Sequence, residues 1–167
     1  MLNYLTFCKE FNYISIDDIK NIQIFFLPQD SNKYRTSLVN DITSLLGTGT
    51  TVYISMYSFT DTYISSSVID IVKSGCVVYL IIDPTQASTT NIDEQLELEG
   101  VFVKRKKSST GFMHDKFMLI EQDKIIWTGS ANWSISSLSQ DNNVLRLKNF
   151  TDIYNLYKEK FLWLWNK

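Results

Sequence analysis

Residues 51–82 read TVYISMYSFTDTYISSSVIDIVKSGCVVYLII, and the expected fold is built outward from this stretch. Residues 51–59 alternate along the chain and are rich in β-branched and aromatic side chains, which is typical of a strand. Asp61 is then expected to cap a helix that runs to residue 74 with apolar residues at helical spacing, and Gly75 follows as a stop. Residues 76–82 are almost entirely apolar, as expected for a parallel strand covered on both faces. The stretch therefore predicts a strand–helix–strand unit.

The same alternation continues on both sides of this unit. Further strands are expected at residues 22–27, 101–104 and 143–147, with a β-hairpin formed by residues 117–120 and 124–127. Further helices are expected at residues 32–46, 91–99 and 152–164. Residues 1–21 stay unassigned, and residues 22–167 are expected to form a single domain. We therefore expect an α/β sandwich with a mixed, largely parallel β-sheet and helices on both faces.

The composition is that of an ordinary globular protein. The 167 residues are 44% hydrophobic and 20% charged, and their net charge of −2 gives no general attraction to nucleic acid or anionic lipid. The two cysteines form neither a disulfide framework nor a zinc-site spacing. The sequence has no signal-peptide pattern and no apolar run of the roughly 20 residues that a spanning helix needs. A cytoplasmic protein without a transmembrane segment is therefore expected.

The single histidine lies in the sequence FMHDKFMLI at residues 112–120. His114 and Lys116 are two residues apart at the start of an expected strand, so both side chains should point to one face, roughly 6–7 Å apart. Ser130 and Asn132 repeat this spacing after the hairpin. The preceding glycine would allow the backbone or a ligand to come close. These four residues are the candidate catalytic groups.

Together these groups predict an anion site that contains a nucleophile. Lys116 carries a fixed positive charge, while Ser130 and Asn132 offer neutral hydrogen-bond donors for phosphoryl oxygens. His114 can act as a nucleophile or exchange protons near neutral pH. The sequence offers no carboxylate cluster, cysteine pair or second histidine to hold a catalytic metal. We therefore expect phosphodiester chemistry by protein groups alone, with no metal and no cofactor.

A known signature has the same order of residues. His114-x-Lys116, four apolar residues, an acid and then Gly129-Ser130-x-Asn132 resembles the H-x-K-x4-D-x6-G-S-x-N pattern of the phospholipase D superfamily. The four typed positions fall in order within a strand–turn–strand context. The resemblance implies a phospholipase D-like catalytic domain.

The resemblance extends beyond the motif, over about residues 22–165. FFLP at residues 25–28 and YISMYSFT at residues 53–60 are similar to the branch of the superfamily that carries one motif per chain. That branch includes small bacterial endonucleases and mitochondrial cardiolipin hydrolase-type proteins with piRNA-nuclease roles.

The chain departs from the signature at two acids. By direct counting the motif acid is Glu121, and twelve residues separate the motif lysine from the glycine, one more than in the signature. Either Glu121 replaces the aspartate, or the turn has an insertion and Asp123 takes the role, which the resemblance implies is mainly structural. Relatives also have a Glu-Asn pair whose carboxylate orients the catalytic histidine. Asp141-Asn142 is the matching pair here, so the resemblance implies that role for Asp141.

Family members use two copies of the motif in one site, whereas this chain has one. The resemblance therefore implies a homodimer in which His114 of each chain approaches one phosphorus atom. One histidine would form a phosphohistidine, the other would protonate the leaving oxygen, and the two Lys116 side chains would neutralise charge. We expect a nuclease that acts on DNA or RNA. The alternatives are hydrolysis of cardiolipin or another phospholipid, and a non-catalytic dimer that binds phosphate.

Candidate substrate-binding residues have both a structural and a functional interpretation. The basic run Lys104-Arg105-Lys106-Lys107 leads into the loop before His114, where it would meet a polyanion, but it could equally be a solvated strand end. Trp133 directly follows the motif and either packs at a helix start or stacks on a base. Trp163 and Trp165 are interpreted as core or interface residues rather than ligand contacts.

Overall fold

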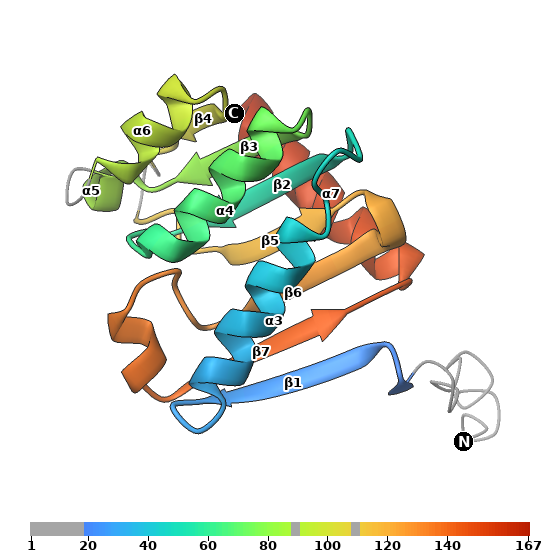
Figure 1. Ribbon diagram of the computed structural model, residues 1–167. Coiled ribbons are helices and arrows are strands. Elements are labelled where there is room, and N and C mark those ends of the chain that lie inside the picture. Colours follow the sequence, from blue (N-terminus) through green and yellow to red (C-terminus); the bar gives the residue numbers. More distant parts are fainter. Residues whose placement is uncertain (1–18, 88–90, 108–110) are drawn as a thin grey trace, which may run out of the picture.

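The computed structural model describes residues 19–87, 91–107 and 111–167. Most of the unassigned N-terminal segment therefore lies outside the described residues. Within them, seven strands form one sheet in the order β1-β7-β6-β5-β2-β3-β4 (Figure 1). The strands are β1 Ile22–Leu27, β2 Thr51–Met56, β3 Val77–Ile82, β4 Phe102–Arg105, β5 Lys116–Ile120, β6 Ile125–Gly129 and β7 Asn142–Leu147. Every predicted strand is found, including both strands of the hairpin.

The sheet is mixed, as expected, but it is not largely parallel. Only β2, β3 and β4 pair in parallel, while the pairings β1–β7, β7–β6, β6–β5 and β5–β2 are antiparallel. Parallel neighbours need a crossover connection, which is usually a helix, whereas a short turn joins antiparallel neighbours. Helices connect β2 to β3 and β3 to β4, but only the hairpin turn connects β5 to β6. The connections therefore limit the parallel part to three strands.

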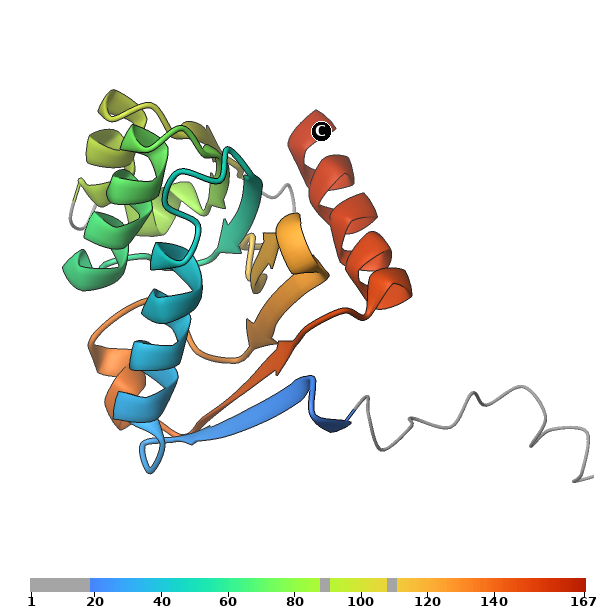
Figure 2. The same cartoon turned by 45° about the vertical axis from the view of Figure 1, so that its right-hand side comes forward.

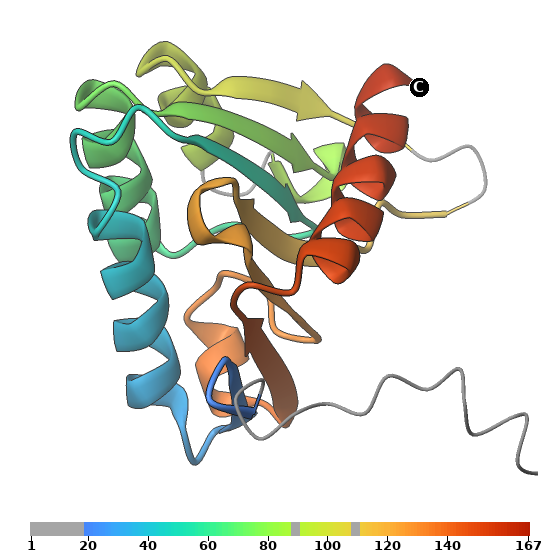
Figure 3. The same ribbon diagram turned by 90° about the vertical axis from the view of Figure 1, so that its right-hand side faces the viewer.

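Helices cover both faces of the sheet, as predicted. Figures 2 and 3 show α3 and α4 on one face and α7 alone on the other. The helices are α3 Ser31–Thr43, α4 Thr62–Lys73, α5 Pro84–Ala87, α6 Ile92–Leu98 and α7 Thr151–Asn166. The short α5 and two 3₁₀ turns, Gln122–Lys124 and Ser136–Ser139, were not predicted. No helix among the described residues has the length and apolarity needed to cross a bilayer.

Two apolar clusters fill the space between the sheet and its helices. Because side chains alternate along a strand, β5 contributes to both clusters. Met118 and Ile120 belong to the cluster under α3 and α4, whereas Phe117 and Leu119 belong to the cluster under α7. All five residues of β5 are buried. The strand that follows His114 is therefore held from both sides.

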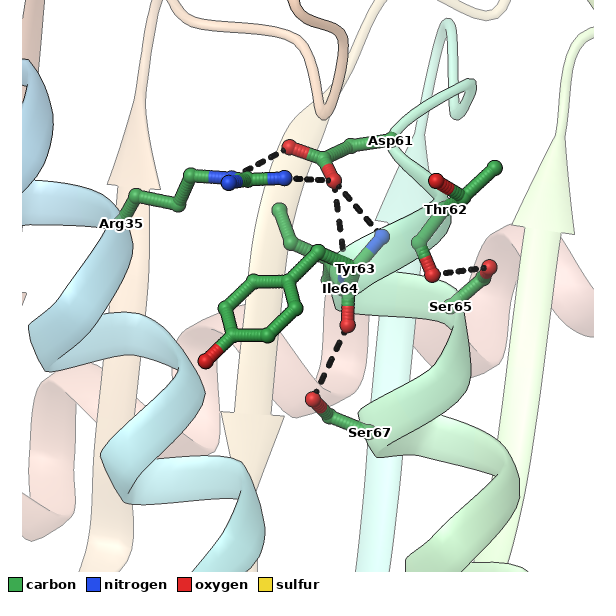
Figure 4. A network of polar contacts seen from close by, with 7 residues as sticks. All are labelled: Arg35, Asp61, Thr62, Tyr63, Ile64, Ser65 and Ser67. Atoms are coloured by element: carbon green, nitrogen blue, oxygen red, sulfur yellow. Dashed lines mark hydrogen bonds and ion pairs between the residues drawn. The ribbon is translucent and has the colours of Figure 1, made fainter.

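Asp61 joins the two helices of one face (Figure 4). Its carboxylate is 1% exposed and accepts hydrogen bonds from the backbone N–H groups of Tyr63 at 2.9 Å and Ile64 at 3.3 Å. This is the predicted N-terminal cap of α4. Arg35 on α3 donates to both oxygens of the same carboxylate, at 2.8 and 2.6 Å. One buried acid therefore caps α4 and ties it to α3.

Candidate active site

One edge of the sheet brings the motif together. β5 is antiparallel to β2 and β6, and β6 is antiparallel to β7, so the starts of β5 and β7 lie beside the ends of β2 and β6. Lys116 pairs with the last residue of β2, and Gly129 pairs with Val144 near the start of β7. His114 precedes β5 and Ser130 follows β6 at this same edge. Strand register therefore assembles residues that are distant in the sequence.

Lys116 is a largely buried cation beside the histidine. Its side chain is buried, with 8% of the residue exposed, and Nζ donates to the backbone oxygen of His114 at 2.9 Å. Burial lowers the pKa of Lys116, although the charge of Asp115 acts in the opposite direction. His114 itself is exposed and lies in the loop just before the strand. An accessible imidazole and a partly desolvated ammonium group therefore lie two residues apart.

Tyr57 contacts both of these groups and was not predicted. Its ring centroid lies 4.6 Å from that of His114 and 5.9 Å from that of Phe112, and the ammonium group of Lys116 lies 5.1 Å from the tyrosine ring. The backbone N–H of Tyr57 donates to the carbonyl of Asp115 at 3.0 Å. The residue directly follows β2, and its position at the end of a strand was the available signal. Tyr57 restricts the positions open to the imidazole.

Asp83 holds the loop before His114 in place. It is 1% exposed, and its carboxylate accepts from the backbone N–H of Met113 at 2.8 Å and from the N–H and hydroxyl of Thr85 at 2.9 and 2.5 Å. Ser55 on β2 contacts the sulfur of Met113 at 3.3 Å. Asp83 was not among the predicted site residues. Its buried carboxylate also positions the residue next to the histidine.

Ser130 is held by the start of β7. Its hydroxyl donates to Oδ1 of Asn142 at 2.9 Å and accepts from the backbone N–H of Asn143 at 3.0 Å. Asn142 in turn donates to the carbonyl of Ser137 at 3.1 Å. Asp141 is exposed, and its side chain forms no hydrogen bond or ion pair within the described ranges. The role of Asp141 toward His114 stays a prediction, and the contact of Asn142 with Ser130 was not predicted.

Asn132 lies in the same segment and is partly buried. Its side-chain oxygen is buried and has no hydrogen-bond partner among the residues that the structure describes. Buried polar atoms are normally paired, so an unpaired one calls for an explanation such as a functional role. The group is available to accept a hydrogen bond.

Glu121 connects the hairpin turn to α7. Its carboxylate contacts Lys124 at 2.6 Å, Lys158 at 2.7 Å and the hydroxyl of Tyr154 at 3.0 Å. Burial alone would raise the pKa of Glu121, but these three hydrogen bonds outweigh it and lower the pKa to about 2. Asp123, the other candidate motif acid, pairs with Lys148 at 2.9 Å at the half-exposed tip of the turn. The contacts of Glu121 are those of a structural acid, and the choice between the two as motif acid stays a prediction.

The basic run divides between two sides of the sheet, because side chains alternate along a strand. Arg105 forms ion pairs with Asp93 at 2.6 Å and Glu97 at 2.8 Å on α6. Lys104 donates to the backbone oxygen of Trp165 on α7. Lys104 and Arg105 therefore have structural partners, and a substrate-binding role for them stays a prediction. Lys106 and Lys107 remain as candidates near His114.

For Trp133 the structure favours the packing interpretation over base stacking. It is 3% exposed, and its ring packs edge-on against Phe59 with centroids 4.9 Å apart. Its backbone exchanges hydrogen bonds with the segment after β2, accepting from Thr60 and Asp61 and donating to Ser58. A ring so enclosed has no free face for a base. Trp133 instead anchors the segment that carries Ser130 and Asn132.

An open pocket of about 580 Å³ lies next to the histidine. It is lined by Lys106, Lys107, Phe112, Met113, His114, Asp115, Lys160, Trp163, Leu164 and Lys167. The loop before β5 and the last turns of α7 therefore form opposite walls. The contribution of α7 was not predicted.

The described residues around His114 include no set of metal ligands. Across residues 19–87, 91–107 and 111–167, no group of three or more His, Cys, Asp and Glu side chains is placed to hold a metal ion. The acids nearest the histidine have other partners: Asp83 holds backbone and threonine groups, and Asp115 lies 3.7 Å from Lys160.

Comparison with known families identifies the domain. The family described as the phospholipase D-like domain of cardiolipin synthase matches residues 42–165. The chain belongs to the phospholipase D superfamily. Proteins named mitochondrial cardiolipin hydrolase are similar to it: the one from Danio rerio is 26% identical over 132 residues, which cover 78% of this chain and 58% of the relative. The one from Chlamydomonas reinhardtii is 27% identical over 123 residues, which cover 72% of this chain and 54% of the relative.

The phospholipase D-like fold also matches solved structures over most of its length. Nuc from Salmonella typhimurium, a phospholipase D family member, superposes with a TM-score of 0.76 at 20% identity, covering 87% of this chain and 93% of that one. NucT from Helicobacter pylori superposes with a TM-score of 0.72 at 23% identity, covering 87% and 95%. Together these matches identify the single-motif branch. The chain spans less than two thirds of the length of the curated relatives that it matches.

Proposed function

We propose that this chain is a metal-independent phosphodiesterase that cleaves nucleic acid at a site shared by two copies of the chain. The observation that carries the proposal is the pairing of an exposed imidazole, His114, with a buried ammonium group, Lys116, at one sheet edge. Ser130 lies at that same edge. These groups provide a nucleophile, a fixed positive charge and a hydroxyl, which are the components that phosphoryl transfer requires.

The proposed reaction has two steps. The imidazole of His114 in one chain attacks phosphorus, so that an N–P bond forms and the P–O bond to the leaving group breaks. His114 of the second chain gives its proton to that leaving oxygen. It then takes a proton from water, whose oxygen attacks phosphorus and releases the first histidine. Lys116 stabilises negative charge on the non-bridging oxygens in both steps.

The proposed dimer follows from this division of roles. One imidazole cannot attack phosphorus from one side and protonate a leaving oxygen on the opposite side, and the chain has one histidine. Phe112, two residues before it, is 61% exposed. An apolar ring next to the site is consistent with contact with a second chain.

Nucleic acid is favoured as the substrate because of the charge beside the histidine. No carboxylate pairs with Lys106 or Lys107 in the part of the chain that the structure describes, and both line the pocket that contains His114. Hydrolysis of cardiolipin or another phospholipid is the second candidate, because the relatives are named for that activity. A non-catalytic phosphate-binding dimer is the third.

The three candidates are separated by incubating the protein with labelled single-stranded DNA, RNA and cardiolipin in EDTA. We expect cleavage of nucleic acid that falls by at least about 10²-fold in His114→Ala. Lys73→Gln, a surface change on α4, is the matched control and should retain full activity. Cleavage of cardiolipin alone would support the second candidate, and tight binding without turnover by wild type and His114→Ala alike would support the third.

Sedimentation, and mixing of wild-type with His114→Ala chains, test whether two chains share one site. Sedimentation should give the mass of a dimer. Heterodimers of wild-type and His114→Ala chains should lose most activity, because each shared site would then lack one histidine. A fully active monomer would contradict the shared site.

A further inference from the structure

The pocket beside His114 has an excess of positive charge. Its lining includes four lysines and one carboxylate, that of Asp115. Asp115 contacts Lys160 at 3.7 Å, which leaves three cations of the pocket without an acid partner among the described residues. Burial and the charges of Lys104, Lys167 and Lys160 lower the pKa of Lys106. These lysines repel one another, so a bound anion would relieve the repulsion.

An aromatic ring lies among these charges. Trp163 is 50% exposed, so of the core and interface roles that the sequence analysis expected, the core role does not apply. The ammonium groups of Lys160 and Lys167 lie 4.9 and 3.8 Å from its ring centroid. Trp165, by contrast, packs against Tyr79 and Phe161 as a core residue should.

Helical spacing explains why these side chains share a wall. Lys160, Trp163 and Leu164 occupy positions i, i+3 and i+4 of one face of α7, and Lys167, at i+7, caps the C-terminal end of the helix. Leu164 is 5% exposed and belongs to the cluster under α7. The basic and aromatic side chains beside it are thereby directed toward the histidine loop.

We infer that this face of α7 is a subsite for one nucleotide of a single-stranded nucleic acid, next to the phosphate that is cleaved. The base stacks on Trp163, and the neighbouring backbone phosphate is bound by Lys106, Lys160 and Lys167. The inference rests on the proposed function and adds to it the strand form of the substrate and a binding role for α7.

The match between pocket and nucleotide is chemical as well as spatial. The volume of about 580 Å³ lies within the roughly 300–1,000 Å³ usual for small-ligand pockets. A nucleotide presents a flat ring and an anion a few ångströms apart, as the tryptophan and its lysines do. A phospholipid headgroup presents the anion only. A base can reach the ring only if it is free of a duplex, and such stacking is the usual basis of single-strand binding.

The test measures binding by fluorescence anisotropy in a His114→Ala background, so that no strand is cleaved. The ligands are a 12-nucleotide single-stranded DNA, an abasic strand of the same length, a duplex, and vesicles containing cardiolipin. The variants are Trp163→Ala, Trp163→Phe and Lys160→Gln, with Lys73→Gln on the far face as the control. Thermal unfolding checks that each variant is folded.

We expect Trp163→Ala to weaken binding of the single strand by about fivefold or more, and Trp163→Phe to retain most of it. The abasic strand should bind wild type and Trp163→Ala equally. Lys160→Gln should reduce the slope of log affinity against log salt by about one. The control should change nothing.

Equal affinity of wild type and Trp163→Ala for the single strand would overturn the inference, as would equally tight binding of the duplex. So would an effect of Trp163→Ala on vesicle binding alone, which would identify a lipid site. Hydrolysis of bis(p-nitrophenyl) phosphate by the histidine-containing protein is measured separately. A failure of the proposed chemistry and a failure of the subsite therefore give different results.

Discussion

Replacing Glu121 by glutamine should destabilise the protein measurably while changing no apolar packing. The pKa of this carboxyl falls from its ordinary 4.5 to about 2 in the folded chain. At about 1.4 kcal/mol per pKa unit, the upper limit of its contribution is about 3–4 kcal/mol. The side chain is 33% exposed, so solvent screening reduces this value. We expect Glu121→Gln to lower the free energy of unfolding by about 1–2 kcal/mol at pH 7.

The contribution should depend on pH in one direction. A carboxyl whose folded pKa is lowered stabilises the folded state fully above its unfolded pKa, and this stabilisation is lost as the pH falls through the folded value. The difference between wild type and Glu121→Gln should therefore be constant above about pH 5 and mostly lost by about pH 2.5. For a chain of this size the loss at pH 7 corresponds to about 3–6 °C in melting temperature.

Urea unfolding at a series of pH values measures this difference. The matched control is Glu159→Gln, because Glu159 is an exposed acid on α7 without a hydrogen bond or ion pair within the described residues. The control should unfold at the wild-type urea concentration. Identical unfolding of Glu121→Gln and wild type at pH 7, or a difference that persists undiminished at pH 2.5, would refute the reasoning.

Three further changes test other parts of the structure. Asp61→Asn should lower the free energy of unfolding by about 2 kcal/mol, because it leaves the guanidinium group from α3 without its acid; unchanged urea unfolding would argue against this tie. Gly129→Ala would place a Cβ 2.2 Å from the backbone oxygen of Asn143, and it should cost about 1–3 kcal/mol and reduce kcat by displacing the next residue, Ser130. A stable and fully active variant would contradict that close approach. Tyr57→Leu removes a ring contact with His114 that is worth about 1 kcal/mol. The change should therefore reduce kcat by up to about tenfold with little change in melting temperature. An unaltered kcat would show that the ring does not position the imidazole.

The parts of the fold predicted from the sequence are those that depend on local pattern. The strand–helix–strand unit at residues 51–82 was recognised from alternation, an Asp cap and a Gly stop, and the structure confirms each element within three residues. The hairpin after Lys116 was recognised in the same way. The proportion of parallel strands was not predicted, because the order of the strands in the sheet depends on which connections contain a helix.

The site residues also divide into those that a local sequence pattern predicts and those that strand pairing brings to the site. His114, Lys116, Ser130 and Asn132 stand in a short ordered pattern that was visible in the sequence. Asp83, Tyr57 and Asn142 contribute through contacts across the sheet edge, and only strand register brings them there. The ion pairs of Arg105 with α6 were not predicted, because neighbouring residues in a strand face opposite sides. The role inferred for Trp163 depends on the face of α7 that remains exposed.

The hairpin of β5 and β6 also bears on how such proteins are recognised. Its open end carries the motif residues, and pairing of Phe117 with Thr128 and of Ile120 with Ile125 keeps that end in register. The extra residue relative to the signature falls at the closed end, where Asp123 and Lys124 have positive φ angles of 61° and 47°. A loop at the far end of a paired ladder can gain or lose a residue without moving the chemistry. Searches for this signature should therefore allow a variable gap between the lysine and the glycine, since a fixed one would overlook chains like this one.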